Sequence, residues 1–137
     1  MKTNFEIEDN YAVQLNGKHI DLHNNFDFIG LSKNGDTISV DFKRTQGDWV
    51  KNDEFKSLKF EFKNVSYEYY EDGDQQALKE DKETLGEITF FPSESREIND
   101  GIIPQTHPNE TDDLIMFFED GKVIRLGCEE IKLMSEK

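Results

Sequence analysis

The chain of 137 residues has one cysteine, three prolines and no long apolar run. Its single cysteine, Cys128, cannot form a disulfide within the chain, so nothing indicates an oxidising compartment. No stretch approaches the roughly 20 apolar residues of a membrane-spanning helix. The first residues, MKTNFEIEDN, lack the apolar segment of a secretory signal. These absences favour a cytoplasmic protein with no membrane partner.

Motifs that carry chemistry are also missing. The sequence has no phosphate-binding glycine loop, nucleophile elbow or zincin helix. His19 and His23 are the histidine pair with a metal-like spacing, but structural zinc usually takes Cys and His in fours. Cys128 alternates with Leu126 on what we expect to be the inward face of a strand, where a thiol behaves as a small hydrophobe. We therefore expect a non-enzymatic protein with no catalytic residue, no metal and no cofactor.

Basic residues are scarce in the middle of the chain. Residues 66–120 hold 16 acids and three bases, whereas residues 1–65 hold 11 acids and nine bases. The formal net charge of −14 is therefore concentrated in one stretch. Such a block repels nucleic acid and anionic membranes and attracts basic proteins, so we expect a basic protein partner and no nucleic acid.

The acidic stretch suggests a recognition surface. An aromatic residue among carboxylates can anchor such a surface, and alternation places Tyr67 and Tyr69 inward and Tyr70 outward. The candidate protein-binding residues are Tyr70, Glu71, Asp72, Asp74, Asp112 and Asp113. Acids on exposed strands and loops also raise solubility and discourage pairing between sheet edges, so that simpler interpretation stays open.

Aromatic residues are frequent, with 11 Phe, four Tyr and one Trp, and this argues against disorder despite the high charge. The length suits one domain, which we place at residues 1–137, with irregular acidic loops near 71–85 and 92–113. Trp49 falls in an expected loop at 44–57, where we interpret it as plugging an end of the sheet stack.

Apolar residues alternate with polar ones on both sides of three turn signals. The pairs Asn16-Gly17, Asn34-Gly35 and Asp120-Gly121 predict tight turns between antiparallel strands. The alternation also predicts that the following residues are mostly buried: Phe28, Ile38, Val40, Phe42, Phe60, Phe62, Phe117 and Ile124.

For three other segments the sequence leaves more than one secondary structure open. Residues 58–69 are either one strand with a bulge at Lys63-Asn64 or two strands. Residues 75–85 are either a short helix or a loop, and Glu129 to Met134 are a last strand or one helical turn. About seven to nine short strands without βαβ alternation predict an all-β fold, an antiparallel sandwich or barrel-like roll, with a small α+β fold as the alternative.

In overall character the chain is similar to the small, acidic, cytoplasmic immunity proteins that neutralise basic bacterial toxins, a comparison that rests on composition. It implies an immunity-like or inhibitor role for a protein-binding module. The alternatives are a small-ligand-binding β-barrel or enzyme, and a structural or assembly subunit. The partner and the oligomeric state are not determined by the sequence.

Overall fold

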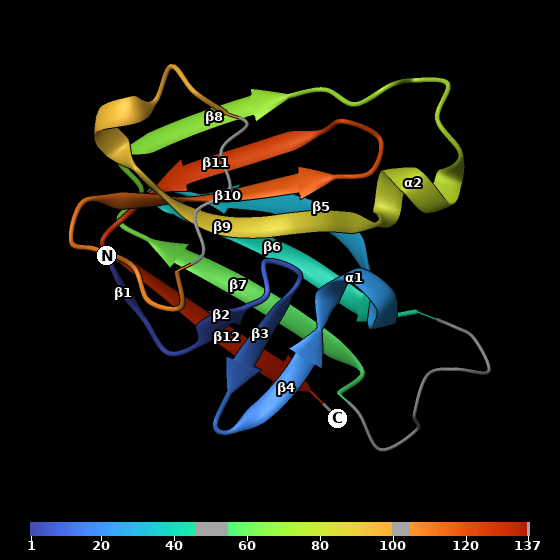
Figure 1. Cartoon of the computed structure of the whole chain (residues 1–137), viewed down its shortest axis with the longest axis horizontal. Helices are drawn as coiled ribbons and strands as arrows, with labels where there is room; N and C mark the ends of the chain where they lie inside the picture. The colour runs from blue at the N-terminus through green and yellow to red at the C-terminus, as the bar shows by residue number, and fades with distance from the viewer. Residues whose placement is uncertain (46–54, 100–104, 137) are drawn as a thin grey trace.

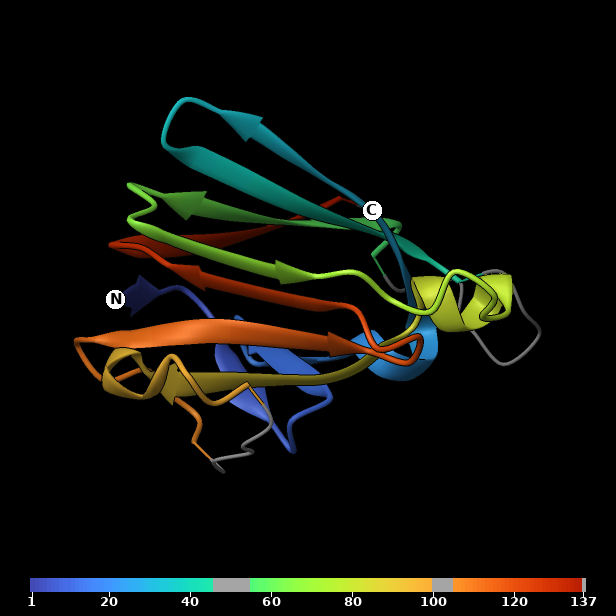
Figure 2. The same ribbon diagram turned by 90° about the horizontal axis from the view of Figure 1, so that it is seen from above.

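A computed structural model describes residues 1–45, 55–99 and 105–136. Most of these residues lie in short strands, which form two facing layers (Figures 1 and 2). The all-β prediction is confirmed. The described residues hold twelve strands rather than seven to nine, because the first 21 residues alone supply four short ones. Trp49 lies outside the described residues.

The back layer in Figure 1 is a five-stranded sheet in the order β1-β12-β7-β6-β5. Its strands are β1 (Lys2–Thr3), β5 (Phe26–Asn34), β6 (Thr37–Arg44), β7 (Ser57–Lys63) and β12 (Glu130–Glu136). The pair β1–β12 is parallel and the other pairs of this sheet are antiparallel. In β6 and β7 every second residue is buried, so the period-two pattern becomes one apolar and one polar face.

The front layer contains a four-stranded sheet in the order β8-β11-β10-β9. Its strands are β8 (Tyr67–Glu71), β9 (Leu85–Pro92), β10 (Asp112–Phe118) and β11 (Val123–Gly127). A three-stranded sheet of β2 (Glu6–Glu8), β3 (Ala12–Leu15) and β4 (Lys18–Asp21) lies beside β9. The main-chain oxygen of Asn10 accepts a hydrogen bond from Ile88 N at 2.8 Å, which joins this small sheet to β9.

Aromatic side chains fill the space between the layers. Phe5 packs against Phe60 of the back sheet, with ring centroids 5.4 Å apart, and against Phe90 of the front sheet at 6.4 Å. Phe42 lies edge-on to Phe60 at 5.8 Å. Residues from all three sheets therefore share one apolar core.

The turn predictions are confirmed. At Asn16-Gly17, which joins β3 to β4, both residues have positive φ (53° and 79°), as a type I′ turn requires. In the second hairpin, β5 continues through Asn34, so the two loop residues are Gly35 and Asp36, one position later than the Asn-Gly pair indicates. Gly35 has a φ of 66°, which a glycine adopts without steric cost. Asp120-Gly121 lies in the turn between β10 and β11.

Sheet pairing settles two of the open alternatives, and the third segment contains a short helix. β7 and β8 are separate strands in different layers, and the chain crosses between them near Asn64, whose φ is 56°. Glu129 to Met134 belongs mostly to strand β12. Within residues 75–85, α2 (Lys79–Glu83) forms a short helix, and a 3-10 turn, η1 (Ser93–Ser95), follows β9.

A second helix, α1 (Leu22–Asn25), was not expected, because Ile20 and Leu22 suggested a continuing strand. The side chain of Asp21 accepts a hydrogen bond from Asn24 N at 2.9 Å and caps this helix, while Leu22 is buried by it.

Six of the eight residues expected to be buried are buried, and Phe28 and Phe117 are only partly buried. Phe28 lies on the edge strand β5, where one flank has no neighbouring strand. Phe117 faces the outer side of the front sheet, because its neighbours Met116 and Phe118 occupy the inner side.

Candidate protein-binding surface

Four of the six residues proposed for protein binding are exposed. Tyr70 is 42% exposed near the end of β8, and Glu71, Asp72 and Asp74 follow it along the chain. The prediction that Tyr67 and Tyr69 face inward and Tyr70 outward is wrong. Tyr69 packs with the outer cluster of Phe91, Ile115 and Val123, and Tyr67 lies on the same face. Tyr70 lies opposite Ile124 in the ladder, on the face that turns toward the core, and stays accessible because β8 is an edge strand. The chain from Tyr70 to Asp74 is therefore accessible to a partner.

Asp112 and Asp113 do not belong to this surface, and their prediction as surface residues is wrong. They are 5% and 1% exposed. Asp112 Oδ2 accepts a hydrogen bond from Asn109 N at 2.7 Å, so its carboxylate closes the turn that precedes β10. Both aspartates are buried because side chains from other segments, among them Arg96, Gln105 and Arg125, cover them. The residues next to Asp112 and Asp113 in the sequence do not indicate this burial.

The Asp113 carboxylate forms ion pairs with two arginine side chains. Its carboxylate accepts hydrogen bonds from Arg125 Nε at 2.9 Å and from Arg96 Nε and Nη2 at 3.0 and 2.9 Å. The Asp113 carboxylate raises the pKa of Arg96 by hydrogen bonding, and the Arg96 guanidinium stacks 3.8 Å from the ring centroid of Tyr67. Arg125 is fully buried and also donates to the carbonyls of Ile98 and Pro92. These hydrogen bonds hold residues 92–99 against the outer side of the front sheet, at β10 and β11.

Other acidic residues belong to segments that lie at the end of the molecule that carries α2 (Figures 1 and 2). They come from three chain segments: the end of β8 with the following loop, helix α2, and the β10–β11 turn. We call the following seven residues the acidic end: Glu71, Asp72, Asp74, Glu80, Asp81, Glu83 and Glu119. All seven are exposed or partly exposed.

Backbone hydrogen bonds bring these segments together. Asp74 N donates to the carbonyl of Asp120 at 2.8 Å, and Glu119 N donates to the carbonyl of Thr84 at 3.0 Å. A Cβ atom on Gly73 would overlap the Asp120 carboxylate, so the loop can approach the turn this closely because residue 73 is glycine. Loop, helix and turn thus form one surface.

Three lysines near the acidic end offset only part of the charge of its seven carboxylates. Lys79 Nζ lies 3.8 Å from Glu83 Oε1, but the lysine side chain is 85% exposed, and such pairs are weak. Lys82 Nζ donates to the carbonyl of Gln75, and Lys122 Nζ lies 3.5 Å from Asp120 Oδ2, beside the carbonyl of Lys82. The seven carboxylates therefore present a net negative surface.

Tyr70 lies at the margin of this surface and contacts a basic residue. Its hydroxyl donates to Glu68 Oε1 at 2.9 Å, and Lys33 of β5 pairs with the same carboxylate and lies 5.7 Å from the Tyr70 ring centroid. Hydrogen bonds from Lys33 and Tyr70 lower the pKa of Glu68, whereas burial and the bond to Glu68 raise the pKa of Tyr70. Lys33 and Glu68 thereby bridge the edge strands of the two layers.

Sequence reasoning missed an apolar residue within the acidic surface. Leu78, at the start of α2, is 69% exposed, the largest exposure among the large hydrophobic residues of the described chain. Its position between Asp74 and Glu80 places an apolar side chain beside the acidic end. The sequence did carry a signal for this exposure. Residues 75–85 contain few apolar residues, so a helix there has only a narrow apolar face with which to bury Leu78.

The histidines and the cysteine do not converge on a reactive centre. His19 Nδ1 lies 3.2 Å from Glu8 Oε2, and His23 Nδ1 lies 2.7 Å from the carbonyl of Leu85. Within the described ranges no cluster of three or more His, Cys, Asp or Glu residues could hold a metal ion. Burial raises the pKa of the partly buried Cys128 thiol to about 12, which opposes formation of a nucleophilic thiolate.

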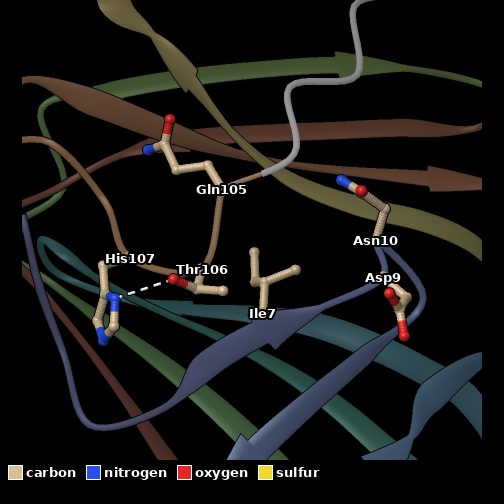
Figure 3. A pocket seen from close by; sticks show the side chains of 6 residues that line it. All are labelled: Ile7, Asp9, Asn10, Gln105, Thr106 and His107. Atoms are coloured by element: carbon tan, nitrogen blue, oxygen red, sulfur yellow. Dashed lines mark hydrogen bonds between the residues drawn. The ribbon is translucent and has the colours of Figure 1, made fainter.

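A polar pocket of about 540 Å³ lies between the β2–β3 turn and residues 105–107 (Figure 3). Its side chains bond to the protein itself: Asn10 Nδ2 donates to the carbonyl of Ile88, and Gln105 Nε2 donates to Asp112. His107 contacts Thr106 Oγ1 at 3.0 Å and Glu6 Oε1 at 3.1 Å. These groups serve to fix the surrounding segments.

Comparisons with protein-family models, with curated proteins and with solved structures found no match to this chain. Among the described residues no helix is both long and apolar enough to cross a membrane.

Proposed function

We propose that the chain is a non-enzymatic protein-binding module that meets a basic protein through the acidic end. The observation that carries this proposal is that three chain segments, which together hold seven exposed or partly exposed carboxylates, meet at one end of the molecule (Figure 1). Opposite charges on two proteins accelerate their encounter more than they raise the final affinity. The exposed Leu78 beside the carboxylates supplies apolar contact area, and an immunity-like or inhibitor role is the most concrete form of this function.

A ligand-binding barrel or an enzyme with an internal site has less support. The space between the layers is filled by apolar side chains, among them Phe42, Phe60 and Phe90, which are fully buried. The acidic end therefore remains the feature of the described chain that best matches a binding function.

The test is a charge reversal with a matched control. The variant Glu71→Lys/Asp72→Lys/Asp74→Lys alters the acidic end, while Glu94→Lys/Glu97→Lys/Glu110→Lys changes the same number of exposed carboxylates elsewhere. A partner is first isolated from the native host by pull-down. We then expect the acidic-end variant to associate more slowly than the control variant, and the rate of the unaltered protein to fall with salt, since exposed charges are screened beyond about 8–10 Å at physiological ionic strength.

Circular dichroism of both variants checks that the fold is intact. A partner that binds equally fast to the two variants, or without dependence on salt, would contradict the proposal.

A further inference from the structure

Aromatic rings of this fold repeatedly carry a cation on one face, and that cation is also paired with a carboxylate. In the described chain, Arg96 lies over the ring of Tyr67 and pairs with Asp113. Lys33 lies over the ring of Tyr70 and pairs with Glu68. Lys122 lies over the rings of Phe28 and Phe118 and pairs with Asp120. The cation lies 3.8 to 5.7 Å from the ring centroid in these cases. A ring face and a carboxylate together attract a cation more strongly than either alone.

Phe117 has the ring and the carboxylates of this arrangement without the cation. It is partly exposed in a cleft of about 370 Å³, which we call the Phe117 cleft, and no ring–cation contact involves it within the described residues. The cleft is lined by Gly86, Glu87, Asn99, Phe117, Phe118 and Glu119, so its described lining has two carboxylates and no basic side chain.

Strand register and a glycine shape the cleft. Glu87 of β9 lies directly opposite Phe117 of β10 in the antiparallel ladder, so the two side chains project from the same face of the sheet. A Cβ atom on Gly86 would lie 3.3 Å from Glu119 Oε1, so glycine leaves room for the Glu119 carboxylate. Two basic side chains that follow β10 in the chain are engaged by other carboxylates: Arg125 by Asp113, and Lys122 by Asp120. His23 Nδ1 lies 3.7 Å from Glu119 Oε1.

We propose that the Phe117 cleft binds the cationic side chain of an arginine or lysine on the basic partner. The ring of Phe117 contacts the cation, and Glu87 and Glu119 supply the opposing charges. This inference rests on the proposed function and identifies the place where the partner's side chain inserts, at the border of the acidic end, to which Glu119 belongs.

The test is a titration of the ¹⁵N-labelled protein with N-acetyl-arginine amide, followed by NMR. The matched probe N-acetyl-citrulline amide has nearly the same shape without the charge. We expect the arginine probe to shift the amide signals of residues 86, 87, 117 and 119, and the citrulline probe to leave them unchanged. The variant Phe117→Leu keeps an apolar side chain, and it should weaken binding about twofold to fivefold by loss of the ring.

The variant Glu87→Gln provides a second measurement at an accessible side chain, with an expected weakening of a similar size, and Glu94→Gln is the control outside the cleft. Shifts confined to residues 71–83, or equal binding by Phe117→Leu, Glu87→Gln and Glu94→Gln, would overturn the inference.

The experiment separates this inference from the proposed function. If the inference fails, salt-dependent partner binding through Glu71, Asp72 and Asp74 would still support the proposed function. Binding of the probe in the cleft without any salt-dependent partner would support the cleft and reject the proposed function.

Discussion

Arg125 lies on the outer side of the front sheet, yet residues 92–99 cover it completely. Its guanidinium donates to Asp113, to the carbonyls of Ile98 and Pro92 and to Asn99 Oδ1. A buried charge is tolerated when it is paired and hydrogen-bonded in this way. Asp113 therefore has a structural role, and its charge is not available to a partner.

Replacing Asp113 with asparagine should destabilise the protein. Arg125 would remain buried beside Arg96 without its carboxylate, and losing one partner of a buried pair costs about 3–5 kcal/mol. Urea unfolding measures this loss in the free energy of unfolding. Glu94→Gln removes an exposed charge from the neighbouring η1 turn and should change stability by less than about 0.5 kcal/mol. Equal stability of the two variants would show that the cluster contributes little.

Cys128 should react slowly with a thiol reagent in the folded protein. Because burial raises the pKa of its thiol to about 12, almost no thiolate exists near pH 8. In the unfolded chain the thiol has its ordinary pKa near 8.5, so the unfolded state loses its proton first. The contribution of Cys128 to stability is thus present below about pH 8.5 and declines as pH rises toward 12. Reaction with a disulfide reagent at pH 8, with and without urea, checks this. A fast reaction without urea would contradict the assigned burial.

At the scale of elements, the tight turns connect the strands because specific residues adopt positive φ. Asn16 and Gly17 do so in the β3–β4 turn, and Gly35 does so in the β5–β6 turn. Asp9 and Asn10 likewise have positive φ in the three-residue loop between β2 and β3, which the sequence did not reveal because it contains no glycine. Asn10 also bonds to Ile88, and this contact supports its left-handed backbone.

Gly17→Ala should therefore destabilise the β3–β4 hairpin. Its φ of 79° strains an alanine by about 1–2 kcal/mol, although nothing lies within 4 Å of the added Cβ atom. Gly30→Ala is the matched control, since its added Cβ atom also meets nothing within 4 Å and its φ is not in the left-handed region. Thermal unfolding of both variants compares them. A larger loss for Gly30→Ala would refute the conformational explanation.

For the whole molecule, the decisive quantity is the distribution of the −14 net charge. The buried Asp112 and Asp113 remove two acids from the surface, and Glu68 is paired with Lys33. The acidic end nevertheless retains seven accessible carboxylates. Close like charges repel one another and destabilise the compact state.

Salt should therefore stabilise the protein. Raising sodium chloride from about 0.01 M to about 1 M shortens the Debye length from roughly 30 Å to roughly 3 Å and screens this repulsion. We expect the melting temperature to rise, and to rise less for Glu71→Lys/Asp72→Lys/Asp74→Lys than for Glu94→Lys/Glu97→Lys/Glu110→Lys. An equal salt dependence of the two triple variants would show that the carboxylates of the acidic end do not interact closely.

The sequence by itself determined the strand-rich class, most of the core and, to within one residue, the position of three turns. These features depend on local rules: alternation of side chains along a strand, burial of Phe and Ile, and the φ values open to Asn and Gly. The buried faces of β6 and β7 follow from alternation alone.

The tertiary structure decided which acids are accessible and which segments meet. Asp112 and Asp113 look like surface residues until Gln105, Arg96 and Arg125, from other parts of the chain, close over them. Likewise, the segments that carry Glu71, Glu80 and Glu119 meet through backbone hydrogen bonds from Asp74 to Asp120 and from Glu119 to Thr84. Such long-range contacts depend on how strands are ordered in the sheets, and the alternating pattern of a strand carries no information about its neighbours.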